Sequence, residues 1–210
     1  MKPLLPITKQ AMPFSVTRSF FPSLNHAAKV HGYKGAVGKL EFLWVRTKDH
    51  WLQVISRIIP YNGVRVKMQR MRGVNIGPKV HLGPMVTIDD VYPYFVTIEE
   101  GASISGQCFI LAHSIPVHYF SDVTESYVAP VVIGRYAWLA INVVIFPGVT
   151  IGEGSIIASG SVVTKSIPPF VMAAGTPAVV KKDIAMQVKK NYTDERFAEI
   201  LGKRKAEFGF

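Results

Sequence analysis

Residues 130–165 of this chain read PVVIGRYAWLAINVVIFPGVTIGEGSIIASGSVVTK. An aliphatic residue recurs in this stretch at every sixth position, and the set is Ile133, Leu139, Ile145, Ile151, Ile157 and Val163. The same spacing occurs earlier, in other phases, at Ile76, Leu82 and Ile88 and at Ile98, Ile104 and Ile110. Amphipathic helices repeat every 3.6 residues and half-buried strands every two, so neither explains a period of six.

A six-residue period predicts a parallel β-helix, in which each repeat supplies one short strand and one turn. Three repeats close a triangular coil, and the aliphatic side chains fill its interior. Glycines support the turns: Gly77, Gly83, Gly134 and Gly152 directly follow the aliphatic position, and Gly148, Gly154 and Gly160 stand three residues after it. We expect coils over about 76–168, with breaks at 89–97 and 112–130.

The composition agrees with one folded domain and its appendages. Apolar residues make up 49% of the 210 residues, which excludes a disordered chain. A single cysteine, Cys108, excludes a disulfide scaffold and favours a reducing compartment. Residues 136–152 carry no charge, but their six-residue repeat and Pro147 argue against a membrane span. No continuous apolar stretch follows the N-terminus, so we expect no signal peptide.

Charge is unevenly distributed along the chain. Residues 1–72 hold 13 Lys and Arg against 2 Asp and Glu, residues 73–163 hold 2 against 7, and residues 164–210 hold 9 against 5. The repeat and these charges divide the chain into three parts. They are a basic N-terminal segment, 1–72, with one helix expected over 40–59; a β-helix domain, 73–182; and a C-terminal segment, 183–210, with a helix expected over 183–206.

One break in the repeat is long enough to form an extruded loop. Residues 113–130, HSIPVHYFSDVTESYVAP, carry two histidines, three aromatic residues, Asp122 and Glu125 in a region otherwise poor in polar side chains. Loops held by a rigid scaffold are where functional residues concentrate. We therefore expect the functional site at this loop.

Three motifs are specific in combination: PGVTIG at 147–152, SVVTKSIPP at 161–169 and AAGTPA at 173–178. With them, residues 73–183 resemble the hexapeptide-repeat acyltransferases that use acetyl-CoA, of the sugar O-acetyltransferase type. The resemblance implies a mainly β fold, a left-handed parallel β-helix, assembled as a homotrimer with each active site in a cleft between neighbouring subunits. The segment IPYNGVRVKMQRMRGVNIG, 59–77, is similar to members that act in surface-polysaccharide biosynthesis.

The resemblance also implies roles for single residues. It makes His113 the catalytic general base, since a sugar hydroxyl is a weak nucleophile and a positioned imidazole takes its proton during attack on the thioester. Acceptor binding is implied for Asp89, Asp90 and His118. Binding of the co-substrate acetyl-CoA is implied for Ala140, Ala158 and Ser159 along pantetheine, Lys165 and Lys182 near the phosphates, and Trp138 at the cleft wall.

A metal-dependent hydratase is the main alternative. Gamma-class carbonic anhydrases share the fold and bind a metal between subunits through three histidines. His113 and His118 have the spacing of two of those ligands, and His81 stands upstream. The anhydrase repeat continues after the second histidine, however, whereas here it stops until Pro130, so we expect no metal. A non-catalytic scaffold is the third hypothesis, and the histidine-bearing interruption argues against it.

The basic N-terminal segment contains no nucleic-acid docking motif, so we expect no nucleic-acid partner. Two interpretations of its helix stay open: a peripheral contact with an anionic membrane surface, or a cap on the open end of the β-helix. We expect a cytoplasmic protein that, on the first interpretation, contacts the inner face of the cell membrane. The acceptor classes that fit are a sugar, a nucleotide sugar and a lipid-linked sugar.

Overall fold

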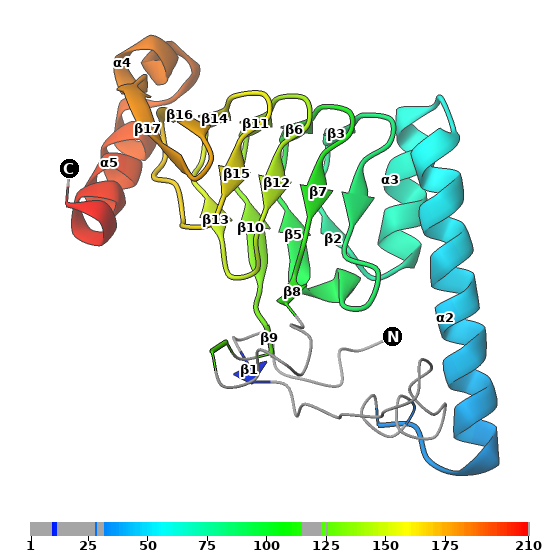
Figure 1. Ribbon diagram of the computed structural model, residues 1–210. Helices are drawn as coiled ribbons and strands as arrows, with labels where there is room; N and C mark the ends of the chain where they lie inside the picture. The colour runs from blue at the N-terminus through cyan, green and yellow to red at the C-terminus, as the bar shows by residue number, and fades with distance from the viewer. Residues whose placement is uncertain (1–9, 12–27, 29–31, 115–122, 125, 210) are drawn as a thin grey trace.

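The structure of the chain is a computed structural model that describes residues 10, 11, 28, 32–114, 123, 124 and 126–209. Its body is a stack of coils whose short strands form three parallel sheets (Figure 1). The first sheet contains β2 (Asn75–Ile76), β5 (Val96–Ile98), β10 (Val131–Ile133) and β13 (Thr150–Ile151). The second contains β3 (His81–Leu82), β6 (Ser103–Ile104), β11 (Trp138–Leu139), β14 (Ile156–Ile157), β16 (Val171–Gly175) and β17 (Ala178–Asp183). The third contains β4 (Thr87–Ile88), β7 (Phe109–Ile110), β12 (Val144–Ile145) and β15 (Val162–Val163).

The predicted aliphatic residues form one interior column along each sheet. In the second sheet the column is Leu82, Ile104, Leu139 and Ile157, and in the third it is Ile88, Ile110, Ile145 and Val163. All of these side chains are at most 1% exposed. Burying each one stabilises the fold by about 1.5–3 kcal/mol. The predicted fold class is confirmed: a mainly β, left-handed parallel β-helix with helices on its N-terminal side and a C-terminal helix.

The coils turn at corners where one residue has a positive φ, three residues after the buried aliphatic residue. At four corners this residue is a glycine, with φ between 65° and 83°: Gly101, Gly148, Gly154 and Gly160. At six others it carries a side chain, with φ between 54° and 62°: Lys79, Met85, Gln107, Tyr136, Asn142 and Phe170. The repeat is therefore one of backbone conformation, and glycine marks only some of its turns.

Gly152, which directly follows the aliphatic residue of β13, lets two coils approach closely. A Cβ atom there would lie 2.2 Å from the backbone nitrogen of Pro169 and 2.4 Å from the backbone carbon of Pro168. Because both obstacles are backbone atoms, the coils must move apart. We expect Gly152→Ala to lower the free energy of unfolding by about 1–3 kcal/mol, measured by thermal unfolding.

The matched control is Gly202→Ala in the C-terminal helix, where a Cβ atom has nothing within 4 Å. Alanine has the higher helix propensity, so this variant is expected to be as stable as the parent or more stable by about 1 kcal/mol. Equal stability of Gly152→Ala and the parent would show that the coils do not need this close approach.

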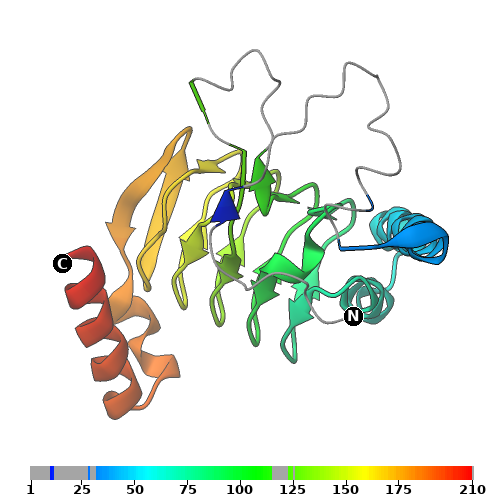
Figure 2. The same ribbon diagram turned by 90° about the horizontal axis from the view of Figure 1, so that it is seen from below.

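Two helices close the N-terminal end of the stack (Figures 1 and 2). α3 (Asn62–Met71) lies against the first coil, and α2 (Gly35–Ile58) packs beside it. The helix expected over 40–59 is therefore α2, which begins five residues earlier, and α3 was not expected. None of the described helices is both long enough and apolar enough to cross a membrane.

Arginines of the α3 segment cap the open edge of the first coil. Each donates to the carbonyl oxygen of one buried aliphatic residue, one in each sheet: Arg70 Nη2 to Ile76 at 2.9 Å, Arg65 Nε to Leu82 at 2.7 Å and Arg72 Nη1 to Ile88 at 3.2 Å. Carbonyl groups at a sheet edge otherwise need water or another chain as partner. Part of the positive charge of residues 1–72 is thus used inside the molecule.

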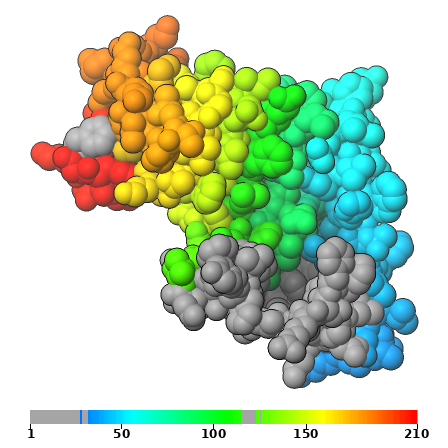
Figure 3. Space-filling view, viewed as in Figure 1, coloured from blue at the N-terminus to red at the C-terminus, as the bar shows by residue number. Residues whose placement is uncertain are grey.

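The C-terminal end is closed by a hairpin and a helical segment. β16 and β17 pair antiparallel, and α4 (Ala185–Val188), a 3-10 turn η3 (Lys189–Asn191) and α5 (Asp194–Phe208) follow. The single helix expected over 183–206 is therefore divided, because Asp183 still belongs to β17 and Thr193 starts a new helix by accepting from the N–H of Arg196 at 3.3 Å. Figure 3 shows the coils as one continuous body between these C-terminal elements and the N-terminal helices.

The chain leaves the coil between β7 and β10, where the repeat is interrupted. The ends of the loop pair antiparallel as β8 (His113–Ser114) and β9 (Tyr127–Val128), and β1 (Gln10–Ala11) adds to β9. Residues 115–122 and 125 lie outside the described part of the chain. His113 therefore stands at the paired root of the loop.

Candidate functional site

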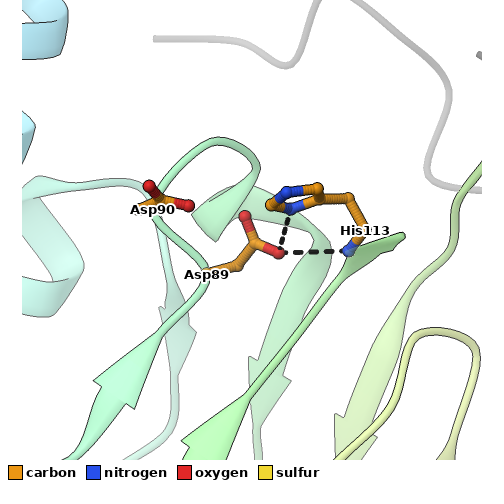
Figure 4. A group of neighbouring side chains, drawn as sticks. All are labelled: Asp89, Asp90 and His113. Atoms are coloured by element: carbon orange, nitrogen blue, oxygen red, sulfur yellow. Dashed lines mark hydrogen bonds and ion pairs between the residues drawn. The ribbon is translucent and has the colours of Figure 1, made fainter. Parts of the chain in front are cut away.

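His113 and Asp89 form a close pair at the root of the loop (Figure 4). Asp89 directly follows β4, and β4 neighbours β7 with Ile88 opposite Ile110, so Asp89 lies one coil away from the start of the loop. Nδ1 of His113 is 2.6 Å from Oδ2 of Asp89. The carboxylate is fully buried, whereas the side chain of His113 is 19% exposed. The imidazole is thus held from the interior and reaches the surface.

The carboxylate of Asp89 is also held by backbone N–H groups. Oδ1 accepts from Val91 at 2.9 Å and Tyr92 at 2.8 Å, and Oδ2 accepts from Ala112 at 2.7 Å and His113 at 3.1 Å. An ionised carboxylate only accepts hydrogen bonds, so a surrounding made of donors favours its charged form. The position of the carboxylate is fixed by the coil itself.

The pair shifts the pKa of both members. Burial raises the pKa of Asp89, but the hydrogen bonds from His113, Tyr92 and Ala112 outweigh burial and keep the pKa below its ordinary value. Burial lowers the pKa of His113, but the hydrogen bond to Asp89 and the charges of Asp89 and Asp90 outweigh it, so the pKa is raised. A neutral His113 donates from Nδ1, which leaves the Nε2 lone pair to take a proton.

The ring of His113 is also positioned by an aromatic neighbour. Tyr92 packs edge-on against it, with ring centroids 5.6 Å apart and an interplanar angle of 64°. Tyr92 is buried, and burial together with the nearby Tyr94 and Asp89 raises its pKa to about 12. It therefore stays neutral and orients the imidazole by packing.

A buried polar network connects the pair to the N-terminal helices. Arg72 donates from Nη2 to the carbonyl oxygen of Asp89 at 2.8 Å, and from Nη1 to Oε1 of Gln69 at 2.7 Å. Gln69 donates from Nε2 to Oε1 of Gln53 at 2.7 Å. Burial lowers the pKa of Arg72 to about 10, so the guanidinium keeps its charge at neutral pH. Nothing in the sequence distinguishes Arg72 from the other cations of residues 1–72, so this contact was not predicted.

Asp90 lies beside the pair but at the surface. Its side chain is exposed, and its carbonyl oxygen accepts from Nη1 of Arg46 in α2 at 2.8 Å. In the described part of the chain, Asp89, Asp90 and His113 are the one group that offers three potential metal ligands within 4.8 Å of one another. Asp89 and His113 bind each other through Nδ1, which leaves Nε2 as the ring nitrogen that does not contact the carboxylate.

The three histidines of the metal alternative are not brought together in the described residues. His81 is exposed on β3 in the second sheet, and His113 follows β7 of the third sheet. His118 lies outside the described residues. His81 belongs to none of the close groups of potential ligands found in the described part of one chain.

Five of the six residues predicted to bind acetyl-CoA lie on the second sheet or at its corner with the third. Ala140 and Ala158 follow β11 and β14, and they occupy equivalent places in adjacent coils. Ser159 is exposed next to Ala158. Across the second sheet, Trp138 pairs with Ile156, which pairs with Met172, which pairs with Lys182. Trp138 and Lys182 therefore lie in the same row. Trp138 is 48% exposed and Lys182 is exposed.

The sixth residue, Lys165, is exposed in the turn after β15, at the opposite corner of the third sheet. His113 stands at that same opposite corner, two coils nearer the N-terminus, since it follows β7 and Lys165 follows β15. The structure therefore brings Asp89, Asp90 and His113 together, and it groups Ala140, Ala158, Ser159, Trp138 and Lys182 separately. Within one chain, the third sheet lies between the two groups.

Cys108 contacts the second group from the interior of the coil. It is fully buried, and its thiol donates to the carbonyl oxygen of Ala140 at 3.1 Å. Burial raises the pKa of the thiol, which makes the thiolate scarce at neutral pH.

Known proteins match the coil region. The family model of bacterial transferase hexapeptide repeats (six repeats) matches residues 130–165. Galactoside O-acetyltransferase of Escherichia coli (strain K12) is 38% identical over 124 residues, which are 55% of this chain and 60% of that protein. The protein of the same organism named as a colanic acid biosynthesis acetyltransferase is 34% identical over 137 residues, 57% of this chain and 74% of that protein. This chain thus spans less than two thirds of the first relative and about three quarters of the second.

Two solved structures have a similar fold. A galactoside acetyltransferase in complex with coenzyme A gives a TM-score of 0.54 at 27% identity, covering 72% of this chain and 87% of that one. A maltose O-acetyltransferase from Clostridium difficile 630 gives a TM-score of 0.54 at 23% identity, covering 69% of this chain and 88% of that one.

Proposed function

Because this chain belongs to the hexapeptide-repeat acetyltransferase family, we propose that it transfers the acetyl group of acetyl-CoA to a hydroxyl group of a sugar. The family membership supports the prediction of an acyltransferase of this kind. The observation that carries the proposal is the pair formed by His113 and Asp89, a histidine with one nitrogen fixed and the other directed away from the carboxylate. Sugars are proposed as acceptors because one relative is named as a galactoside O-acetyltransferase and one similar solved structure as a galactoside acetyltransferase.

In the proposed mechanism His113 is the general base and Asp89 positions it. Asp89 accepts the Nδ1 hydrogen bond, so the lone pair of the neutral ring is on Nε2. Nε2 takes the proton of the sugar hydroxyl as its oxygen attacks the carbonyl carbon of the acetyl thioester. The C–S bond then breaks, and the protonated ring returns the proton to the leaving sulfur. The products are the acetylated sugar and free coenzyme A. A base of this kind contributes roughly 10²–10⁴-fold to the rate.

We assign the two neighbouring carboxylates different roles. The sequence suggested that both contact the acceptor, but Asp89 is buried and its oxygens accept five hydrogen bonds. Asp90 is exposed beside His113, so we propose that Asp90 accepts from acceptor hydroxyl groups. His118 keeps its predicted acceptor role as a proposal.

The residues proposed to hold acetyl-CoA fit its chemistry. Ala140, Ala158 and Ser159 have small side chains at one corner, which leaves the backbone accessible to the narrow pantetheine chain. Lys182 and Lys165 are exposed cations that can pair with phosphates, and Trp138 presents an exposed aromatic surface. Bound acetyl-CoA supplies the activated acetyl group, and we propose that no metal is needed.

We propose that the working unit is a homotrimer. Within one chain the third sheet separates His113 from the group around Ala140 and Ala158. A cleft between two subunits would place His113 of one subunit opposite the acetyl-CoA residues of the next, which fits this separation. The protein is further proposed to act in the cytoplasm, on a nucleotide sugar or lipid-linked sugar of surface-polysaccharide biosynthesis, and to contact the inner face of the membrane through residues 1–72.

Acetyl-CoA-dependent release of free thiol, measured over a panel of acceptors, tests the proposed function. We expect thiol release and an acetylated product, identified by mass spectrometry, with at least one of free sugars, nucleotide sugars and lipid-linked sugars. A chelator is expected to leave the rate unchanged. Absence of transfer to every class would contradict the sugar assignment. Loss of activity with the chelator, restored by zinc or iron, would instead support the hydratase alternative.

A further inference from the structure

The aspartate that fixes His113 lies on the terminal coil of the stack. Asp89 follows β4 of the first coil, and its N–H donates to the carbonyl oxygen of Ile110 in the next coil at 2.8 Å. The carbonyl oxygens of the first coil are therefore directed out of the stack, where the described part of the chain places helices and no further coil. Terminal repeats have one neighbour fewer than the others and open more readily. The geometry of the pair thus depends on how firmly the first coil is held.

Two arginines of the N-terminal helical segment bind the backbone around Asp89. Arg72, directly after α3, donates from Nη1 to the carbonyl oxygen of Ile88 at 3.2 Å and from Nη2 to that of Asp89 at 2.8 Å. Arg46 of α2 donates from Nη1 to the carbonyl oxygen of Asp90 at 2.8 Å. Three consecutive carbonyl oxygens are thus bound by two guanidinium groups. We call Arg46 and Arg72 the clamp.

Arg72 is itself held in a fixed orientation. It is 4% exposed, and its Nη1 also donates to the side-chain oxygens of Gln53 and Gln69. Gln69 in turn donates to the hydroxyl of Ser56 in α2 at 3.0 Å. A guanidinium group presents its N–H donors in a rigid planar fork, whereas an ammonium group is a point charge on a flexible chain. The fork allows one side chain to bind two peptide oxygens and two amide oxygens at once.

We propose that Arg72 and Arg46 are positioning residues for the acetyl transfer and act through the backbone of residues 88–90. Arg72 fixes the peptide that carries the carboxylate of Asp89, and through it the ring of His113. Arg46 fixes the peptide of Asp90, the residue proposed to bind the acceptor. A displacement of about 1 Å that starts far from the reacting atoms can cost about 10²-fold in rate. This inference rests on the proposed function, and it makes the N-terminal helices part of the active site.

Lysine substitutions separate the geometry of the clamp from its charge. The charges that act on the pKa of His113 are those of Asp89 and Asp90, which raise it, and Arg46, which lowers it, and Tyr92 packs against the ring. Lysine keeps the positive charge of either arginine but not the fork. If the carboxylate of Asp89 then moves away from Nδ1, the hydrogen bond and the attraction that raise the pKa of His113 both weaken. The pKa of His113 should therefore fall.

Steady-state kinetics over a range of pH, together with an NMR titration of the full chain, test the proposal. Arg72→Lys is expected to lower kcat at least about tenfold, to leave KM for acetyl-CoA unchanged, and to move the rising limb of kcat/KM to lower pH. The NMR signal of His113, identified by its absence from His113→Ala, should also titrate at lower pH. Arg46→Lys is expected to raise KM for the acceptor at least about threefold, with a smaller effect on kcat.

Arg65→Lys is the matched control. Arg65 is a buried arginine of α3 that donates to the carbonyl oxygen of Leu82 at 2.7 Å, in the second sheet and away from Asp89. Arg65→Lys and Arg72→Lys should lose stability to a similar extent in thermal unfolding. The control should nevertheless keep the kcat and the His113 titration of the parent.

Parent-like kcat and a parent-like titration of His113 in Arg72→Lys would overturn the proposal. Equal changes in Arg65→Lys would overturn it too, because any loosening of the first coil would then have the same effect. If Arg72→Lys does not fold, Arg46→Lys decides, and an unchanged KM for the acceptor contradicts the clamp. The NMR titration needs no turnover. A lowered pKa of His113 in Arg72→Lys, with no acetyl transfer by the parent, would support the hold of the clamp on the pair and contradict the proposed function instead.

Discussion

The variant His113→Ala is expected to retain the fold and to transfer acetyl groups at least about a hundredfold more slowly than the parent. The loss follows from the geometry, because His113 is the titratable side chain whose ring is both fixed by Asp89 and open to the surface. Without it, no positioned base takes the proton of the acceptor hydroxyl. The measurement is kcat for thiol release at saturating acetyl-CoA, with the best acceptor found in the panel.

His81→Ala is the matched control for this variant. His81 is exposed on β3, outside the Asp89–His113 group, so its loss is expected to leave kcat unchanged. Near-parent turnover of His113→Ala would rule out the proposed base. If each of the two substitutions abolished activity and also removed a bound metal ion, the three-histidine metal site would replace the proposed mechanism.

The variant Asp89→Asn is expected to reduce kcat about 10²–10⁴-fold, since the amide no longer holds His113 in the tautomer that carries the lone pair on Nε2. It should also move the pH profile. In the parent, activity rises as pH increases through the raised pKa of His113, because the base must be neutral. Removing the carboxylate charge lowers that pKa, so the rising limb of kcat/KM should shift to lower pH.

The shift of the pH profile separates a positioning role from a structural one. Asparagine also places an amide N–H₂ group among the N–H donors of Val91, Tyr92 and Ala112, so some loss of stability, on the order of 1–3 kcal/mol, is expected. Destabilisation alone would not change the pKa of His113 in the molecules that remain folded. Asp90→Asn is the control: it keeps the Nδ1 hydrogen bond, and it should raise KM for the acceptor more than it lowers kcat. An unshifted profile in Asp89→Asn would contradict the proposed pair.

The coil region was predictable because its signal is periodic. Every inward position must be aliphatic, so Ile133 to Val163 reveal the coils without any knowledge of long-range contacts. The interruption that begins at His113 was visible for the same reason. The turns were only partly visible, since Lys79 and Met85 adopt positive φ although they are neither glycine nor asparagine.

The remaining features depend on contacts between distant segments. Asp89 and His113 are 24 residues apart, and their pairing follows from coil stacking and not from a local motif. Both aspartates were predicted to bind the acceptor because the sequence gives no reason to treat two adjacent aspartates differently. Only burial, which the structure shows, distinguishes Asp89 from Asp90. Arg72 was missed for a related reason: its role depends on the end of the first coil lying within reach of its guanidinium.

The arginine cap also prevents another β-helix from stacking on the first coil of this chain. A parallel β-helix offers at each end an edge of N–H and C=O groups spaced to accept another identical coil, so the architecture has no intrinsic length limit. At the first coil, guanidinium groups from Arg65, Arg70 and Arg72 occupy the carbonyl oxygens that a further coil would use. An uncapped end of this kind is a template for end-to-end growth, as at the tip of a fibril. A ten-residue helix and the arginine that follows it therefore keep the protein a discrete particle and not the subunit of a filament.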